Sequence, residues 1–206
     1  MPFHYLSTLF RILLVGFMLG LGSIQAQSSD PTPKPDRYLG KFTILAGLSQ
    51  PIFLSGYNLA ATYFTSKWSF EYSHGWSLDY PTAIRDENLL SLSSPYSTGF
   101  GVGYRFTRNF DLRAEFKANG YQAQLINGET LEYTTFVIGL GAYYRLHLWR
   151  GIILEPSLRY WPNLSSTLPG NLHTYAATDG ATLTHEANDY GLFANVSIGY
   201  VIGSHR

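Results

Sequence analysis

The sequence predicts an all-β fold, an eight-stranded antiparallel up-and-down transmembrane β-barrel. Three observations support it: eight segments in which apolar and polar residues alternate, connections that are alternately short and long, and aromatic residues near both ends of the segments. A period of two is the side-chain period of a β-strand, so each strand has one apolar and one polar face. The segments are close to the ~9–11 residues with which a tilted strand crosses a bilayer.

The first four segments are residues 41–48, 57–63, 68–76 and 99–106. Even positions are apolar in the first segment, with Lys41 on the opposite face, and odd positions are mostly apolar in the second. In the third, aromatic residues and a histidine alternate with serines, a glutamate and a glycine. In the fourth, aromatic residues and a valine alternate with three glycines and an arginine. Each pattern predicts a strand with one face towards lipid.

The last four segments are residues 110–119, 135–146, 152–160 and 192–202. In 110–119 every even position is apolar, and four of the five odd positions are charged. Even positions also carry the apolar face of the other three segments, where Pro156 is one of them. Because proline cannot donate a ladder hydrogen bond, we expect a bulge or a local gap at Pro156.

The connections between these segments alternate strictly in length. Three are tight, at residues 65–66, 107–109 and 147–150, and four are longer, at 50–55, 77–96, 121–133 and 162–189. Outer-membrane barrels have short periplasmic turns and longer external loops. The alternation therefore predicts which end of the barrel faces outwards, and an even strand number returns both chain ends to the periplasm.

Aromatic residues gather near the predicted membrane boundaries, where amphipathic rings prefer to lie. One girdle is expected near the short turns, from Tyr63, Trp68, Phe106, Trp149 and Tyr200. The other is expected near the long loops, from Tyr57, Trp76, Phe136, Tyr160 and Tyr190.

Composition excludes several classes of function. Charged residues make up 14% of the 206 residues, against ~25% in soluble domains, and aromatic residues make up 16%. The formal net charge is zero and no basic stripe occurs, so we expect no nucleic-acid partner. The chain has no cysteine, which excludes disulfides, thiol catalysis and cysteine-ligated zinc. We expect no cofactor.

The N-terminal residues are typical of an export signal. Arg11 precedes an apolar run at 12–21, and small residues follow at 23–26. The run has the length of a signal-peptide core and is too short to span a bilayer as a helix, although an uncleaved anchor stays an alternative. We therefore expect a signal peptide at 1–26, cleaved after Ala26, and a disordered periplasmic lead at 27–39. The barrel is expected at 40–203 and a periplasmic tail at 204–206.

The alternation alone also fits a soluble sandwich or a lipocalin-like barrel, because it does not say which face is wet. Loop lengths and the aromatic girdles speak against this alternative. So do five glycines on the same strand faces as the charges: Gly99, Gly101, Gly103, Gly139 and Gly141. A narrow lumen needs small residues beside large ones, which a solvent-facing surface does not.

With these features together, the chain resembles the small eight-stranded outer-membrane barrels of the OmpA/OmpX type, and in particular those that lack a periplasmic domain. The resemblance covers residues 40–203 and is one of pattern. It implies a location in the outer membrane of a Gram-negative bacterium, and architecture rather than a particular activity.

Side chains on the polar faces are expected to share the lumen. By parity these include ten charged residues: Lys41, Glu71, Arg105, Asp111, Arg113, Glu115, Lys117, Arg145, Glu155 and Arg159. Paired, they would form a network that plugs the barrel, since an eight-stranded interior is only just wide enough for side chains. The functional alternative is a gated proton or ion path.

Residues 72–77 contain the most tempting catalytic motif. Some eight-stranded outer-membrane barrels are lipid A deacylases, in which a serine and a histidine lie two residues apart on one strand face. Here Ser73 and His74 are adjacent and face opposite ways, and Ser77 has the wrong parity unless a bulge intervenes; Glu71 would be the acid. These four residues form only a weak catalytic alternative.

The last long loop should project as a hairpin, because Asp179 and Gly180 form a turn signal between two strand-like arms. His173, His185, Glu186 and the loop's aspartates lack the tight spacing of a metal site, and we expect no metal. The loop at 77–96, with Asp79, Asp86 and Glu87 near Leu89, Leu90 and Leu92, is expected to include a helical turn.

We therefore expect a monomeric, non-enzymatic outer-membrane barrel with a plugged polar lumen. Its expected role is outer-membrane integrity, or contact with an extracellular protein or surface partner through loops 77–96 and 162–189. Its other expected partners are outer-membrane lipid and lipopolysaccharide. The alternative is a hydrolase that modifies lipid A in the outer leaflet.

Overall fold

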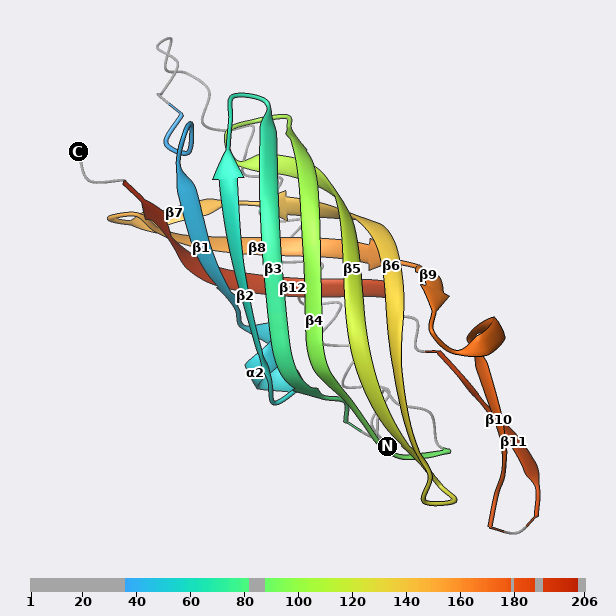
Figure 1. Ribbon diagram of the computed structural model, residues 1–206. Helices are drawn as coiled ribbons and strands as arrows, with labels where there is room; N and C mark the ends of the chain where they lie inside the picture. The colour runs from blue at the N-terminus through green and yellow to red at the C-terminus, as the bar shows by residue number, and fades with distance from the viewer. Residues whose placement is uncertain (1–35, 82–87, 179, 188–190, 204–206) are drawn as a thin grey trace. The chain divides into compact units, whose positions relative to one another are not determined.

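The computed structural model describes residues 36–81, 88–178, 180–187 and 191–203 (Figure 1). The expected signal peptide, most of the lead and the tail at 204–206 lie outside these residues. Tyr38, which we assigned to the lead, is only 1% exposed and packs against Phe64 with ring centroids 5.5 Å apart. It belongs to the compact unit Tyr38–Arg206. Within the described residues, no helix is long and apolar enough to cross a membrane.

The architecture is the closed antiparallel eight-stranded barrel that the sequence predicts. Its wall consists of β1 (Phe42–Gly47), β2 (Tyr57–Phe64), β3 (Trp68–Asp79), β4 (Leu89–Arg105), β5 (Phe110–Leu125), β6 (Thr130–Tyr144), β8 (Ile152–Trp161) and β12 (Gly191–Ile202). Each strand pairs with its neighbour in this order, and β12 pairs back with β1 from Phe42 opposite Ile202 to Gly47 opposite Ser197.

Two short strands complete the wall on either side of Pro156. β7 (Leu146–Trp149) pairs with the beginning of β8, and β9 (Asn163–Ser166) pairs with β6. Pairing of β6 with β8 ends at Tyr143 opposite Ser157 and resumes at Leu146 opposite Leu154 in the same register. The positions left without pairing face Pro156 and Glu155. The gap expected at Pro156 is thus present, because proline cannot donate to that ladder.

The two ends of the barrel differ, as the alternating loop lengths predict. The turns after β2, β4 and β7 are short and lie at one end, together with the outer ends of β1 and β12. The other end carries helix α2 (Ser49–Phe53), the single-turn η2 (Pro169–Asn171) and a separate hairpin of β10 (Leu172–Ala176) and β11 (Thr182–Glu186). The β10–β11 pairing confirms the hairpin expected in the last loop, although Asp179 of the expected turn lies outside the described residues.

Strands β4, β5 and β6 continue well beyond the segments recognised in the sequence, so the expected long loop at 121–133 was wrong. Residues 121–133 form strand extensions around a tight turn, with Gly128 at φ 89° donating to the Leu125 carbonyl. Residues 89–92, expected near a helical turn, belong to β4, while residues 82–87 of that loop lie outside the described residues. Register shifts between Leu89 and Ser91 and between Ser93 and Tyr96 interrupt the alternation there, which explains why it was missed.

Buried apolar side chains form a cluster at each end. Near the short turns the cluster contains Tyr38, Leu45, Phe64, Ile153 and Val201. At the other end, an apolar cap draws on α2, the strand extensions and the hairpin: Leu54, Leu78, Tyr80, Leu89, Leu92, Tyr121, Ala123, Leu125, Tyr133, Tyr175 and Ala187.

Between these clusters the barrel is inverted relative to a soluble protein. Large apolar side chains cover the outer wall; Ile138 and Leu140 on β6 are 51% and 67% exposed. Charged side chains fill the inside, where Arg113 and Arg145 are 0% exposed. A water-soluble barrel would place these residues the other way round, because burying charge is costly and apolar surface avoids water.

Candidate functional site

The candidate site is the charged interior of the barrel. Its charged side chains come from β3, β4, β5, β8 and the residue between β6 and β7, always from odd-numbered positions. Nine of the ten charged residues expected in the lumen are buried there: Glu71, Arg105, Asp111, Arg113, Glu115, Lys117, Arg145, Glu155 and Arg159.

Arg113 is the centre of this network. Its Nε donates to Asp111 Oδ2 at 2.6 Å and its Nη2 to Glu155 Oε2 at 3.2 Å, while Nη1 donates to Glu71. Its guanidinium also lies 3.7 Å from the ring centroid of Tyr143. One cation therefore joins carboxylates from three strands, β3, β5 and β8.

Arg145 forms a second layer, nearer the short turns. Its Nη1 donates to Asp111 and, at 3.3 Å, to Glu155, so both carboxylates are shared by two arginines. Asp111 also accepts a hydrogen bond from Ser69 at 2.7 Å. The Arg145 guanidinium lies 4.6 Å from the ring centroid of Phe64, against the apolar cluster at that end.

Glu115 organises the layer nearer the long connections. It accepts hydrogen bonds from the Tyr143 hydroxyl and from Trp161 Nε1, the latter at 3.0 Å. Lys117 Nζ lies 3.9 Å from Glu115 Oε2, 3.0 Å from Ser73 Oγ and 4.6 Å from the Trp161 ring centroid. Arg159 Nε donates to Ser157 Oγ at 3.0 Å. Cations on this layer are thus held mainly by neutral groups.

Two expected members lie apart from the ion pairs. Arg105 donates to the Thr65 carbonyl and, at 3.3 Å, to the Arg108 carbonyl, so it binds the backbone of two short turns. Lys41, the residue before β1, is half-buried and forms no ion pair with another described residue. Whether a residue number is odd or even gives the strand face on which its side chain lies, but not its position along the barrel axis.

Tyr143 and Trp161 were missed as members of the site. Both occupy odd positions, which face inwards on β6 and β8, and this parity is the signal that could have identified them. Gly103 shows how tightly the interior is filled: a Cβ there would lie 2.6 Å from Arg113 Cγ and 2.9 Å from Asp111 Oδ2. The network needs small residues opposite its long side chains.

The weak catalytic alternative is not assembled. Ser73 faces inwards and bonds Lys117, whereas His74 faces outwards and stacks on Trp76 with ring centroids 6.0 Å apart. Ser77 is exposed at φ 55°, and no hydrogen bond joins it to His74 within the described part of the chain. Glu71 points to the interior and binds Arg113.

The aromatic residues expected in girdles lie on the outer wall wherever the structure describes them. Tyr57, Trp68, Phe106, Trp149 and Tyr160 are each 46–61% exposed. Trp76 is 36% exposed, and the remaining three described members are half-buried: Tyr63, Phe136 and Tyr200. Tyr190 lies outside the described residues.

The two histidines of the β10–β11 hairpin, His173 and His185, contact different partners. His173 Nε2 lies 3.2 Å from Glu129 Oε1, while His185 Nε2 is 3.1 Å from the Tyr133 hydroxyl inside the apolar cap. Groups of three or more His, Asp or Glu side chains suited to a metal do not occur among the described residues.

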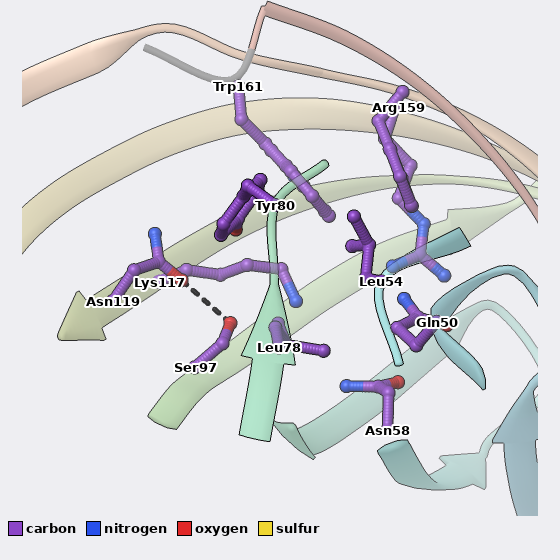
Figure 2. A pocket seen from close by; sticks show the side chains of 11 residues that line it. Gln50, Leu54, Asn58, Leu78, Tyr80, Ser97, Lys117, Asn119, Arg159 and Trp161 are labelled. Carbon is purple, nitrogen blue, oxygen red and sulfur yellow. Dashed lines mark hydrogen bonds between the residues drawn. The ribbon is translucent and has the colours of Figure 1, made fainter. Parts of the chain in front are cut away.

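A small cavity of about 40 Å³ lies between the charged interior and the apolar cap (Figure 2). Polar residues line part of it: Gln50, Asn58, Ser97, Lys117, Asn119 and Arg159. Apolar and aromatic residues line the rest: Leu54, Leu78, Tyr80, Trp161 and Phe193. Burial raises the pKa of the Tyr80 phenol well above its usual value.

Comparison with known proteins gives similarity in architecture. No family model matches the sequence, and no curated protein matches it. The chain is similar to the N-terminal β-barrel domain of Pseudomonas aeruginosa OprF, with 15% identity, TM-score 0.43, and coverage of 80% of this chain and 98% of that one. It is also similar to Ail, the attachment invasion locus protein of Yersinia pestis, with 12% identity, TM-score 0.44, and coverage of 80% and 99%. The structure of outer membrane protein Ail in phospholipid bilayer nanodiscs gives 16% identity, TM-score 0.43, and coverage of 79% and 99%.

Proposed function

We propose that this protein is a non-enzymatic outer-membrane β-barrel whose lumen is plugged by its own charged side chains. The observation that carries the proposal is the inversion of the barrel. Ion pairs and hydrogen bonds fill the inside, while the wall outside is apolar around every strand. This arrangement is favourable only in a hydrocarbon environment. The closed barrel lets every strand form its backbone hydrogen bonds with its two neighbours, and the buried charges pair with one another.

The dense contacts inside support a plug rather than an ion path. Arg113 and Arg145 bridge β3, β5 and β8 across the interior, and Tyr143 and Trp161 fill the space beside them. An ion crossing this layer would have to break several buried ion pairs at once. Such pairs are costly to break, because each leaves an uncompensated charge.

The orientation and export are proposed from the chain's ends. The N-terminal pattern of a charged residue, an apolar run and small residues supports export with cleavage after Ala26. Short turns would then face the periplasm, and the end with α2, the strand extensions and the β10–β11 hairpin would face outwards.

The outward end supports a role in surface contact as well as in membrane integrity. The strand extensions and hairpin share an apolar core of their own, so they form an ordered surface rather than loose loops. We infer a monomer that contacts lipopolysaccharide with its wall, and an extracellular protein or surface with residues 77–96 and 162–189.

The plug is tested by conductance. The purified protein, refolded in planar lipid bilayers, should show no steady ion conductance, whereas a variant that opens the interior, Arg113→Ala with Tyr143→Ala, should conduct. A large-conductance porin reconstituted in parallel controls for insertion. Steady conductance of the unmodified protein would overturn the plug, and recovery of the protein with inner-membrane or soluble fractions would overturn its location.

The enzymatic alternative is tested separately by mass spectrometry of lipid A from outer membranes with and without the protein. The opposite directions of Ser73 and His74 speak for unchanged acyl chains. A protein-dependent loss of an acyl chain would overturn the non-enzymatic proposal.

A further inference from the structure

We propose that the cavity above the charged network binds a small oxyanion, a phosphate or a carboxylate, on Lys117, Arg159 and Asn119. This goes beyond the proposed function, because neither membrane location nor a plugged lumen requires a ligand there. Figure 2 shows Lys117 and Arg159 entering the cavity from different sides with their nitrogen atoms directed into it. They come from β5 and β8, on separate parts of the barrel wall.

The first argument is a buried cation without an ion pair. Among the described residues, the buried aspartate, glutamate, lysine and arginine side chains are five cations and four carboxylates. Arg105 binds backbone carbonyls at the short turns, Arg113 and Arg145 share Asp111 and Glu155, and Lys117 lies 3.9 Å from Glu115. Arg159, which lines the cavity, forms no ion pair with another described residue. A buried cation without an ion-pair partner is costly, and an anion from solution would compensate it.

The second argument is that the carboxylates facing this layer are already engaged. Glu115 accepts from Tyr143 and Trp161, and Glu71 accepts from Arg113 and, at 3.2 Å, from Thr62. Lys117 remains 3.9 Å from Glu115. Within the described residues, Arg159 makes one hydrogen bond, through Nε, so both of its Nη atoms can donate to a ligand.

The third argument is an unused donor. Asn119 is 1% exposed and lines the cavity; its Oδ1 accepts from Ser97 Oγ at 2.6 Å, and its Nδ2 has no partner among the described residues. Buried polar groups in proteins almost always have a partner, so this orphaned amide N–H indicates a missing acceptor. An oxyanion brings several acceptor oxygens and a negative charge that Lys117 and Arg159 favour, whereas a cation offers no acceptor and a water molecule no charge.

The size and walls of the cavity restrict the ligand. A volume of about 40 Å³ admits a few atoms, and Leu54, Leu78 and Phe193 close the other side. The ligand is therefore a compact anion in the lumen rather than a lipid on the outer wall, and inorganic phosphate and acetate are suitable probes.

The test is isothermal titration calorimetry of the full chain, refolded in neutral detergent, with sodium phosphate or sodium acetate against sodium chloride at equal ionic strength. The proposal predicts saturable one-to-one binding of phosphate or acetate that chloride does not reproduce. Lys117→Met should weaken it at least tenfold, while Lys67→Met, which removes an exposed lysine at the short-turn end, should leave it unchanged.

Folding of each variant is checked by heat-modifiable gel migration. If Lys117→Met does not give the folded band, Asn58→Leu replaces it, because it keeps every charge and fills the cavity, and the same tenfold loss is expected. Absence of saturable binding to the unmodified protein would overturn the proposal. So would equal affinities of the cavity variant and Lys67→Met, or a heat signal seen only with short-chain phosphatidic acid, which would indicate a lipid headgroup on the wall.

Discussion

Replacing Arg113 by methionine removes the cation on which the interior carboxylates converge. Arg113 is fully buried and binds Glu71, Asp111 and Glu155. Methionine keeps much of the volume of the aliphatic stem, so the change mainly removes charge and hydrogen bonds. Breaking a buried ion pair from one side costs about 3–5 kcal/mol, and we expect the free energy of unfolding to fall by that amount.

The contacts that remain in Arg113→Met show which carboxylate loses most of its stabilisation. Asp111 keeps Arg145 and the Ser69 hydroxyl, and Glu155 keeps Arg145 at 3.3 Å. Among the residues that the structure describes, Glu71 keeps only the Thr62 hydroxyl as a hydrogen-bond partner. Neutralising it should therefore relieve the variant: Arg113→Met with Glu71→Gln should recover at least about 1 kcal/mol of the loss, as coupled neighbours do.

Urea titration of the protein refolded in phospholipid vesicles measures these differences, with the folded fraction read from heat-modifiable gel migration. Arg150→Met is the matched control, because Arg150 is exposed at the turn between β7 and β8 and should change the free energy of unfolding by less than about 1 kcal/mol. A loss for Arg113→Met no larger than that of the control would refute Arg113 as the centre of the network. Failure of Glu71→Gln to recover any stability would refute the assignment of the cost to Glu71.

Three further changes test the wall and the outward end. Ile138→Arg puts a cation on the outer wall and should destabilise the barrel by about 2–4 kcal/mol in the same urea titration; normal stability would contradict the face assignment. Gly139→Ala should cost about 1–3 kcal/mol by overpacking, since a Cβ there would lie 2.5 Å from Trp161 Cδ1 and 2.9 Å from the Tyr160 carbonyl carbon. Replacing residues 171–186 by a Gly/Ser turn should preserve the folded band and lose about 1.5–3 kcal/mol through Tyr175, which is buried in the apolar cap. Loss of the folded band would make the hairpin part of the barrel core.

The alternation of side chains was sufficient to predict the strands of the wall and their faces. Residues 110–119 alternate without interruption, and their odd positions all face inwards. The strand extensions were harder to recognise. Around Ser93 and Tyr96 a register irregularity places two outward residues side by side, which hides the period of two, and residues 121–125 were read as a loop although they alternate.

Which charged side chains pair with one another in the interior could not be predicted from the sequence, for a different reason. Arg113 binds Asp111 two positions away on its own strand, but Glu71 and Glu155 each lie 42 positions away. Contacts between distant strands depend on their tilt and stagger, which the period of two does not specify. Parity therefore placed Arg105 and Lys41 on the inner face without revealing that they lie apart from the ion pairs.

The pairing of β1 with β12 joins residues as far apart as Phe42 and Ile202. Until the last strand has been synthesised, β1 and β8 both present an open edge, and in hydrocarbon each unpaired backbone group costs several kcal/mol. Insertion of a growing chain strand by strand is therefore unfavourable, and assembly has to await the C-terminal strand. A transcript that ends before codon 191 would yield a polypeptide with most of the wall but no stable place in a bilayer, leaving it to proteolysis rather than to a partly working pore.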